Sequence, residues 1–154
     1  MRLTIAAVGR LRAGPEKALV DAYLGRLAWP VSVREVAEMR AREPVVRRER
    51  ENRLLLAALP AGARLVALDS RGLALDSEGF AARLGDWQDR GVAELGFLVG
   101  GADGLEAATL ARAELVLSFG RMTWPHLLAR AMLAEQLYRA QSILAGHPYH
   151  RGAG

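Results

Sequence analysis

The stretch FLVGGADGL, residues 97–105, decides the fold of this chain. An apolar run, LGFLV at 95–99, passes directly into a segment with glycines at 100, 101 and 104. A short apolar run that ends in turn residues is typical of a buried strand. Glycines after a strand permit positive φ or a close approach of the backbone to a ligand. The stretch therefore predicts a strand followed by either a tight structural turn or a ligand-binding loop.

The rest of the chain alternates short apolar runs with longer amphipathic ones. Strands are predicted at 3–8, 31–36, 64–69, 95–99 and 114–118. Helices are predicted at 15–27, 47–59, 77–89, 106–113 and 125–145. This alternation predicts an α/β fold, a single compact domain over residues 1–154 whose mainly parallel sheet carries helices on both faces.

Local residue types predict where several elements begin and end. Pro15 suits the first turn of a helix. Ser77 is expected to cap the helix that it opens. The triplet Ser70-Arg71-Gly72 predicts a turn after the third strand, and Gly146 with Pro148 predicts the end of the last helix.

Composition excludes several classes of protein. The chain has no cysteine, which excludes disulfide frameworks and thiolate metal sites, and its three histidines are too scattered to predict a zinc site. No metal is therefore expected. No apolar run approaches the ~20 residues that span a bilayer, so no membrane association is expected. The N-terminal apolar run is too short for a secretory signal, and we expect a cytoplasmic protein.

The charge pattern permits an RNA partner. The net charge is +4, and all of the 21 basic residues except Lys17 are arginines. Codon bias also explains this excess of arginine over lysine. From Arg121 onward, four arginines oppose one acid, Glu135. A mild positive balance of this kind is compatible with RNA binding without establishing it. The charge-dense segment 39–53 has mixed signs, which favours a loop and an exposed helix face over an RNA-contacting arm.

The predicted last helix has apolar residues on more than one face. Such a helix is either central in the fold or buried by a partner. Because the domain is small, we favour a homodimer contact for part of it. Glu135 and Arg139 stand four residues apart in the order that favours an ion pair. Arg130 and Arg139 suit phosphate or dimer contacts, and a solvated helix face is the equal alternative.

A second loop resembles the glycine loop in its setting. LSFGRMTWPH, residues 117–126, also connects a strand to a helix and contains a glycine. Ligands bind outside the carboxyl ends of parallel strands, so the two loops could wall one pocket. Neither loop has the spacing of a dinucleotide fingerprint or of a P-loop. Core packing of Met122 and Trp124, and local bonding of His126, are the alternatives.

The tail GHPYHRGAG, residues 146–154, combines three chemical groups. Tyr149, His150 and Arg151 offer a stacking face, a titrating imidazole and an anion donor, which together suit a nucleobase. Chain ends usually fray, so a disordered tail is the alternative.

Four stretches in this order resemble the RlmH (YbeA-like) family of SPOUT methyltransferases: MRLTIAAVGR, FLVGGADGL, LSFGRMTWPH and AEQLYRAQSILAGHPYHR. The resemblance covers essentially the whole chain. It implies a compact α/β domain with a C-terminal trefoil knot, whose loops bind S-adenosylmethionine (SAM) in a bent shape. It implies a homodimer that methylates N3 of a pseudouridine in 23S rRNA of the large subunit, within the assembled ribosome. A non-catalytic RNA-binding or ribosome-assembly module on the same fold is the alternative.

The resemblance also implies roles for individual residues. The positions that match the family's donor-binding places are Leu68, Gly101, Gly120, Arg121, Met122, Thr123, Trp124 and Pro125. The tail matches the segment implicated in substrate handling. We expect His150 to act as the base, Arg151 to balance charge on the substrate carbonyls, and Tyr149 to position the base.

The chain departs from the family pattern at three places. Ala102-Asp103 stands where Pro-Glu is usual, and Gly120 where Ser is usual. Gly152-Ala153-Gly154 extends a tail that normally stops near Arg151. We therefore expect the second loop to hold the donor mainly through its backbone.

Overall fold

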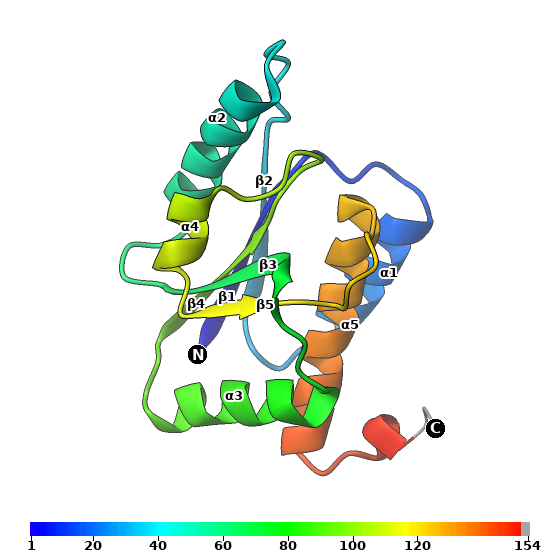
Figure 1. Cartoon of the computed structure of the whole chain (residues 1–154). Coiled ribbons are helices and arrows are strands. Elements are labelled where there is room, and N and C mark those ends of the chain that lie inside the picture. The colour runs from blue at the N-terminus through cyan, green and yellow to red at the C-terminus, as the bar shows by residue number, and fades with distance from the viewer. Residues whose placement is uncertain (152–154) are drawn as a thin grey trace.

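Five parallel strands form one sheet in the order β2-β1-β4-β3-β5 (Figure 1). The computed structural model describes residues 1–151, apart from the side chain of His150. The strands are β1 (Arg2–Val8), β2 (Val31–Val36), β3 (Arg64–Leu73), β4 (Glu94–Val99) and β5 (Leu115–Leu117). Every pairing between neighbours is parallel, so the predicted parallel sheet is confirmed.

Helices cover both faces of the sheet, as predicted. They are α1 (Pro15–Leu24), α2 (Pro44–Ala57), α3 (Ser77–Asp89), α4 (Ala107–Arg112) and α5 (His126–Leu144), followed by a 3₁₀ helix, η1 (Pro148–Arg151). In Figure 1, α2 and α4 lie on one side of the strands and α1 and α5 lie side by side on the other. α3 and α5 pack against one face of the sheet, and α2 and α4 pack against the opposite face.

The side chains of β1 alternate between two apolar layers. Leu3 and Ile5 belong to the larger core with the side chains of α3 and α5, and Ala6 and Val8 face α2. Because both faces are covered, the central strands β1 and β4 are almost wholly buried and read as continuous apolar runs, whereas β2 at the edge is mostly exposed. Because every pairing is parallel, the carboxyl ends of the strands lie at one edge of the sheet.

The turn predicted at residues 70–72 is wrong, because β3 continues to Leu73. After a register irregularity beyond Leu68, Leu73 pairs with Leu117 on β5. Gly72 makes this approach possible, since a Cβ at that position would lie 2.3 Å from the carbonyl oxygen of Val116. The turn-forming residue types mark a close strand contact here instead of a chain reversal.

The cap predicted at Ser77 is also wrong. Asp76 is the N-cap residue of α3, and its Oδ1 accepts a hydrogen bond of 2.7 Å from the backbone N–H of Gly79. A carboxylate one residue earlier reaches the free amide of the first turn. Ser77 is left as the first helical residue, and its hydroxyl donates to Gln136 Oε1 at 2.8 Å on α5.

The apolar faces of α5 are buried largely within the chain itself. The helix lies between α1 on one side and α3 with the sheet on the other. Five of its apolar residues are buried there: Ala131, Leu133, Ala134, Leu137 and Ala140. The central position predicted as one of two alternatives therefore explains the pattern, and a homodimer contact stays a prediction.

Arg130 serves neither of the roles predicted for it. Its side chain is 0% exposed. Nη1 donates to Glu35 Oε2 at 2.8 Å, and Nη2 donates to the carbonyl oxygens of Val8 and Gly9 at 2.9 Å each. These carbonyls follow the end of β1, where the sheet no longer supplies donors, so a buried guanidinium satisfies them.

Arg139 and Glu135 form the predicted ion pair, with Nη2 at 2.6 Å from Oε1. The Arg139 guanidinium also lies 5.1 Å from the centre of the Tyr149 ring. Both side chains are mostly buried, so Arg139 is not on a solvated face.

The trefoil knot implied by the resemblance concerns how the chain threads and stays a prediction. Within residues 1–151, no helix is long and apolar enough to cross a membrane.

Candidate functional site

A cavity of about 650 Å³, here called the loop pocket, lies at the carboxyl ends of β3, β4 and β5. Its walls come from residues 68–70, 99–104, 117, 119–120 and 122–126, with Ala129 from α5. The two loops that the sequence predicts around one pocket therefore meet, joined by the end of β3. Of the positions predicted to bind the donor, seven line it: Leu68, Gly101, Gly120, Met122, Thr123, Trp124 and Pro125. Arg121 does not line it.

The glycines of the first loop serve the turn as well as the pocket. Gly104 has a φ of +75°, and its N–H donates to the carbonyl oxygen of Gly101 at 3.0 Å. A Cβ at Gly101 would lie 2.8 Å from Glu51 Oε2 and 2.9 Å from Val8 Cγ1. The two alternatives for this stretch, structural turn and pocket wall, are thus combined in one loop.

Asn52 on α2 holds the glycine loop from behind. It is fully buried, and its Nδ2 donates to the carbonyl oxygens of Arg48 and Gly104 at 2.7 and 3.2 Å. Its Oδ1 accepts from the N–H of Glu106 at 3.0 Å. A buried amide with three backbone partners fixes the path of the loop where it leaves the pocket.

An ion pair ties the tip of the same loop to α2. Arg47 Nε lies 2.9 Å from Asp103 Oδ2, and Arg47 Nη2 lies 3.2 Å from Oδ1. This bidentate geometry holds the pKa of Asp103 below its usual range. The sequence does not predict this pair, because Arg47 and Asp103 lie 56 residues apart and only the fold brings them together. Together, Arg47, Glu51 and Asn52 form what we call the α2 clamp.

Glu51 is the titratable member of the α2 clamp. Its carboxyl is buried against Gly101, and burial raises its pKa, with Asp103 and Glu38 acting in the same direction. Arg47 opposes them. The α2 clamp thus places a carboxyl with a raised pKa behind the wall of the loop pocket, against Gly101.

Hydrogen bonds of the Ser118 hydroxyl with the backbone of Ser70 and Gly120 hold the second loop. The Ser118 hydroxyl donates to the carbonyl oxygen of Ser70 at 3.2 Å and accepts from the N–H of Gly120 at 3.1 Å. Gly120 has a φ of +104°, which disfavours a side chain there. Met122 and Trp124 are 74% and 40% exposed, so core packing does not explain them.

His126 begins α5 at the edge of the loop pocket and is half-buried. Burial lowers its pKa, and nearby Arg130 lowers it further, while Glu38 acts in the opposite direction. The imidazole is therefore held in its neutral form at neutral pH.

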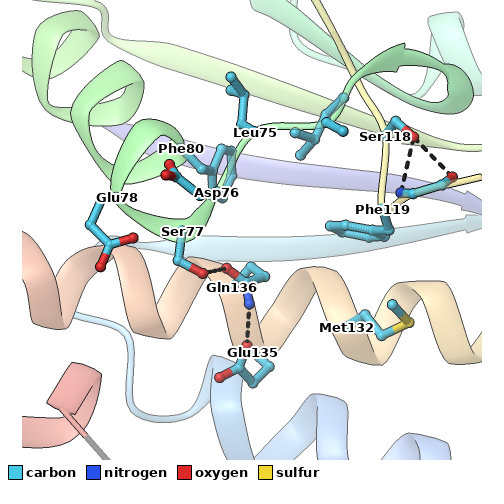
Figure 2. Close-up of a pocket in the computed structure, with 13 residues that line it drawn as sticks. Leu75, Asp76, Ser77, Glu78, Phe80, Ser118, Phe119, Met132, Glu135 and Gln136 are labelled. Carbon is cyan, nitrogen blue, oxygen red and sulfur yellow. Dashed lines mark hydrogen bonds between the residues drawn. The ribbon is translucent and has the colours of Figure 1, made fainter. Parts of the chain in front are cut away.

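A second cavity of about 650 Å³, here called the side pocket, lies between the start of α3, α5 and the end of β5 (Figure 2). It is lined by Ala74–Glu78 and Phe80, by Leu117–Gly120, and by Met132, Glu135 and Gln136 of α5. Leu117, Phe119 and Gly120 line both pockets. The two cavities are therefore neighbours separated by the start of the second loop.

The tail is folded, so the disordered alternative is wrong for residues 148–151. The Tyr149 ring meets the Tyr138 ring edge-on with centres 4.7 Å apart. Its hydroxyl lies 3.2 Å from Glu135 Oε1 and 3.3 Å from the Tyr23 hydroxyl. Burial, Tyr23 and Glu135 raise the pKa of Tyr149, which is protonated at neutral pH.

The structure does not bring the tail into the loop pocket. Neither Tyr149 nor Arg151 lines it, and Arg151 is exposed. The His150 side chain and residues 152–154 lie outside the described part of the chain. Glu135, which binds Tyr149, lines the side pocket, so the side pocket lies between the loop pocket and the tail.

Among the described residues, no group of three His, Asp or Glu side chains could hold a metal ion.

Comparison with known proteins assigns the family. Residues 1–150 match the family model described as "Predicted SPOUT methyltransferase". The chain is 58% identical to the ribosomal RNA large subunit methyltransferase H of Rhodospirillum centenum, over 98% of this chain and 99% of that protein. The protein of the same name from Paramagnetospirillum magneticum is 56% identical over the same shares. The chain belongs to the SPOUT methyltransferase family, in the group that carries this name, as its four motifs predict.

A solved structure from Legionella pneumophila with bound SAM is also similar. Its TM-score is 0.46 and its sequence identity 12%, over 91% of this chain and 66% of that chain. Similarity at this level adds nothing to the assignment.

Proposed function

We propose that this protein is a SAM-dependent methyltransferase of large-subunit ribosomal RNA, with N3 of a pseudouridine in 23S rRNA as its target. The observation that carries the proposal is the loop pocket, where seven of the eight positions matched to the family's donor site converge. The near full-length identity to proteins named as large-subunit rRNA methyltransferases supports the substrate class.

The residues of the loop pocket fit SAM. Its volume lies within the about 300–1,000 Å³ typical of small-molecule sites. Leu68, Val99 and Leu117 provide apolar surface for an adenine ring, and the glycine-rich backbone at 100–104 can come close to it. We expect Gly101 and the segment 120–125 to hold the donor chiefly through backbone groups. When bound, SAM would supply an electrophilic methyl group.

The chain must align the acceptor and remove one proton. The N3 nitrogen of a pseudouridine carries a hydrogen, which must leave before its electron pair can form the new N–C bond. The S–C bond breaks as the N–C bond forms, and the sulfur keeps the electron pair. Alignment of the two reacting atoms and proton removal are both tasks for protein side chains.

The tail is the proposed source of the base. A histidine with an ordinary pKa near ~6.5 can accept a proton at neutral pH, and we assign this role to His150. Arg151 would balance charge on the neighbouring carbonyl oxygens. Tyr149 is unsuited as a base because its pKa is raised, and its packing against α5 supports a positioning role. Unaided ionisation of the imide, with the tail only positioning RNA, is the alternative.

Comparison of His150→Ala with the wild-type enzyme tests this assignment. The rate of methyl transfer is measured from pH 6 to 9. We expect the variant to lose most of its rate, and its pH–rate profile to lose the rise that lies near the pKa of histidine. An unchanged rate with an unchanged pH profile would assign the proton to another acceptor.

The proposal also includes a homodimer that acts on assembled ribosomes in the cytoplasm. The decisive assay incubates the protein with labelled SAM and either intact ribosomes or naked 23S rRNA from cells that lack it. We expect label on ribosomes, at one nucleotide that blocks reverse transcription because its pairing face is methylated. Ribosome binding without SAM binding or label would instead support the non-catalytic module.

A further inference from the structure

We propose that a group of exposed arginines beside the loop pocket, here called the basic edge, binds phosphates of the ribosomal RNA on either side of the target nucleotide. The basic edge consists of Arg10, Arg12, Arg40, Arg42 and Arg121. The inference rests on the proposed function and adds to it the surface that holds the RNA.

The members of the basic edge all follow the carboxyl ends of strands. Two come after β1, two after β2 and one after β5. Because every strand pairing is parallel, these segments lie at the edge of the sheet where the loop pocket opens. In Figure 1 the chain after β1 and after β2 lies at the same end of the molecule as the glycine loop after β4.

The segment after β1 is fixed beside a wall of the loop pocket. Leu11 is buried, whereas its two neighbours, both members of the basic edge, are exposed. The N–H of Leu11 donates to Glu35 Oε2 at 2.5 Å. A Cβ at the preceding Gly9 would lie 3.4 Å from Nε2 of His126, which lines the loop pocket. An anchored leucine therefore presents an arginine on each side of it next to the pocket.

The segment after β2 is joined to the opposite wall through the α2 clamp. Arg47 Nη1 donates to the carbonyl oxygens of Ala41 and Arg42 at 2.8 and 3.2 Å. The same guanidinium binds Asp103 at the tip of the glycine loop. One buried contact thus fixes the backbone that carries the second pair of arginines relative to the donor-binding loop.

The guanidinium groups of the basic edge are free to bind a ligand. Within the described part of the chain, none of the five forms an ion pair, a hydrogen bond or a ring contact. At the opposite edge of the sheet, by contrast, Arg2, Arg64 and Arg90 are each paired with a carboxylate. An unpaired guanidinium keeps its planar fork of donors, which matches the oxygens of a phosphate.

Phosphates are the groups that a nucleic acid would bring to this edge. A base that reaches a donor in the loop pocket is joined to the RNA backbone on both sides, so phosphates lie outside the mouth of the pocket. Contacts to phosphates fix the position and orientation of a nucleic acid without reading its sequence. We infer that the basic edge supplies affinity and orientation, and that the base is recognised inside the site.

The two pairs of arginines differ in their surroundings. Glu38 and Glu43 are exposed in the same segment as Arg40 and Arg42 and reduce its positive charge. No acid stands within residues 9–13. We therefore expect the arginines after β1 to contribute more to RNA binding than those after β2.

The test uses two double variants. Arg10→Gln, Arg12→Gln removes the charges after β1, and Arg40→Gln, Arg42→Gln removes those after β2. For methyl transfer to intact ribosomes, we expect kcat/KM to fall about 10-fold in the first variant and less in the second, through KM. The slope of log affinity for ribosomes against log salt should become shallower by about 1–2 in the first variant.

A third double variant is the matched control. Arg90→Gln, Arg112→Gln removes two exposed arginines at the ends of α3 and α4, which lie at the opposite edge of the sheet. It changes the net charge by the same amount and should keep the wild-type kcat/KM and salt slope. SAM affinity, measured by calorimetry, should be equal in all four proteins.

The outcomes separate this inference from the proposed function. With an active wild type, unchanged kcat/KM and salt slope in the two test variants overturn the inference alone. An equal loss in the control also overturns it, because net charge and not the basic edge would then set binding. Binding to phosphatidylserine vesicles that the test variants lose, with ribosome binding unchanged, would assign the basic edge to a lipid surface. Absence of methyl transfer by the wild-type protein overturns the proposed function.

Discussion

Gly120 lines both cavities, and its backbone has a φ of +104°, which a residue with a side chain rarely adopts. A Cβ there meets no neighbouring atom within 4 Å, so the cost of a side chain is conformational and not steric. We expect Gly120→Ala to lower the free energy of unfolding by about 1–2 kcal/mol. Urea denaturation measures it, and calorimetry with SAM should show weaker binding.

Gly14→Ala is the matched control for this substitution. Gly14 has an extended backbone with a φ of 163°, and a Cβ there would make only ordinary contacts at 3.8 Å. Equal losses of stability in the two variants would show that the backbone at Gly120 is not strained by a side chain.

His126 should make stability depend on pH. Burial lowers its folded-state pKa, so the unfolded chain binds a proton more readily than the folded one. The stability is present above the unfolded value of about 6.5 and is lost as the pH falls below it. We expect the melting temperature of the wild type to fall more than that of His126→Gln between pH 7.5 and 5.5. Parallel curves for the two proteins would rule out His126 as the titrating group.

At the scale of elements, α2 determines the shape of the glycine loop although no residue of the helix lines the loop pocket. Where the family usually has proline, the chain has Ala102, and the neighbouring Asp103 is held by Arg47. The ion pair fixes the tip of the glycine loop against α2.

We therefore expect Arg47→Gln to weaken SAM binding while the protein still folds. Calorimetry should show lower affinity, with partial recovery in the charge-exchanged Arg47→Asp, Asp103→Arg protein. Arg53→Gln is the control, since Arg53 lies on the same helix with 73% of its side chain exposed. Equal SAM affinity in Arg47→Gln and Arg53→Gln would mean that the ion pair does not shape the loop.

Arg130 connects α5 with the ends of β1 and β2. Replacement by leucine leaves Glu35 and the carbonyl oxygens of Val8 and Gly9 without their partner. We expect Arg130→Leu to cost about 3–5 kcal/mol, the usual effect of breaking a buried charge pair. Arg90→Leu, at a helix surface, should change stability by less than about 0.5 kcal/mol. A similarly small loss at Arg130 would show that water replaces the guanidinium.

At the scale of the whole molecule, the protein is expected to be a homodimer. The apolar residues of α5 that first suggested a partner are mostly buried within the chain, but Met122 and Trp124 are exposed at the loop pocket. Sedimentation equilibrium should give twice the mass of the chain at micromolar concentration. A monomer under these conditions that still transfers methyl groups would remove the dimer from the proposal.

Much of the fold follows from local pattern. Apolar runs at 3–8 and 95–99 predict buried strands, because a strand covered on both faces needs apolar residues at successive positions. The glycines of the first loop and the motif at 117–126 identify the pocket walls, because the local backbone conformation of each loop favours particular residue types. The family follows from the order of four such motifs.

The sequence by itself determined the alternation of strands and helices, the family and the two loops that meet at one pocket. Only the tertiary structure decided the partners of Arg130, Arg47 and Asn52, the extension of β3 to Leu73 and the side pocket beside Gln136. The physical reason is range. Apolar periodicity and glycine geometry act over a few neighbouring residues, whereas a charged or amide side chain finds its partner among residues that only folding brings near.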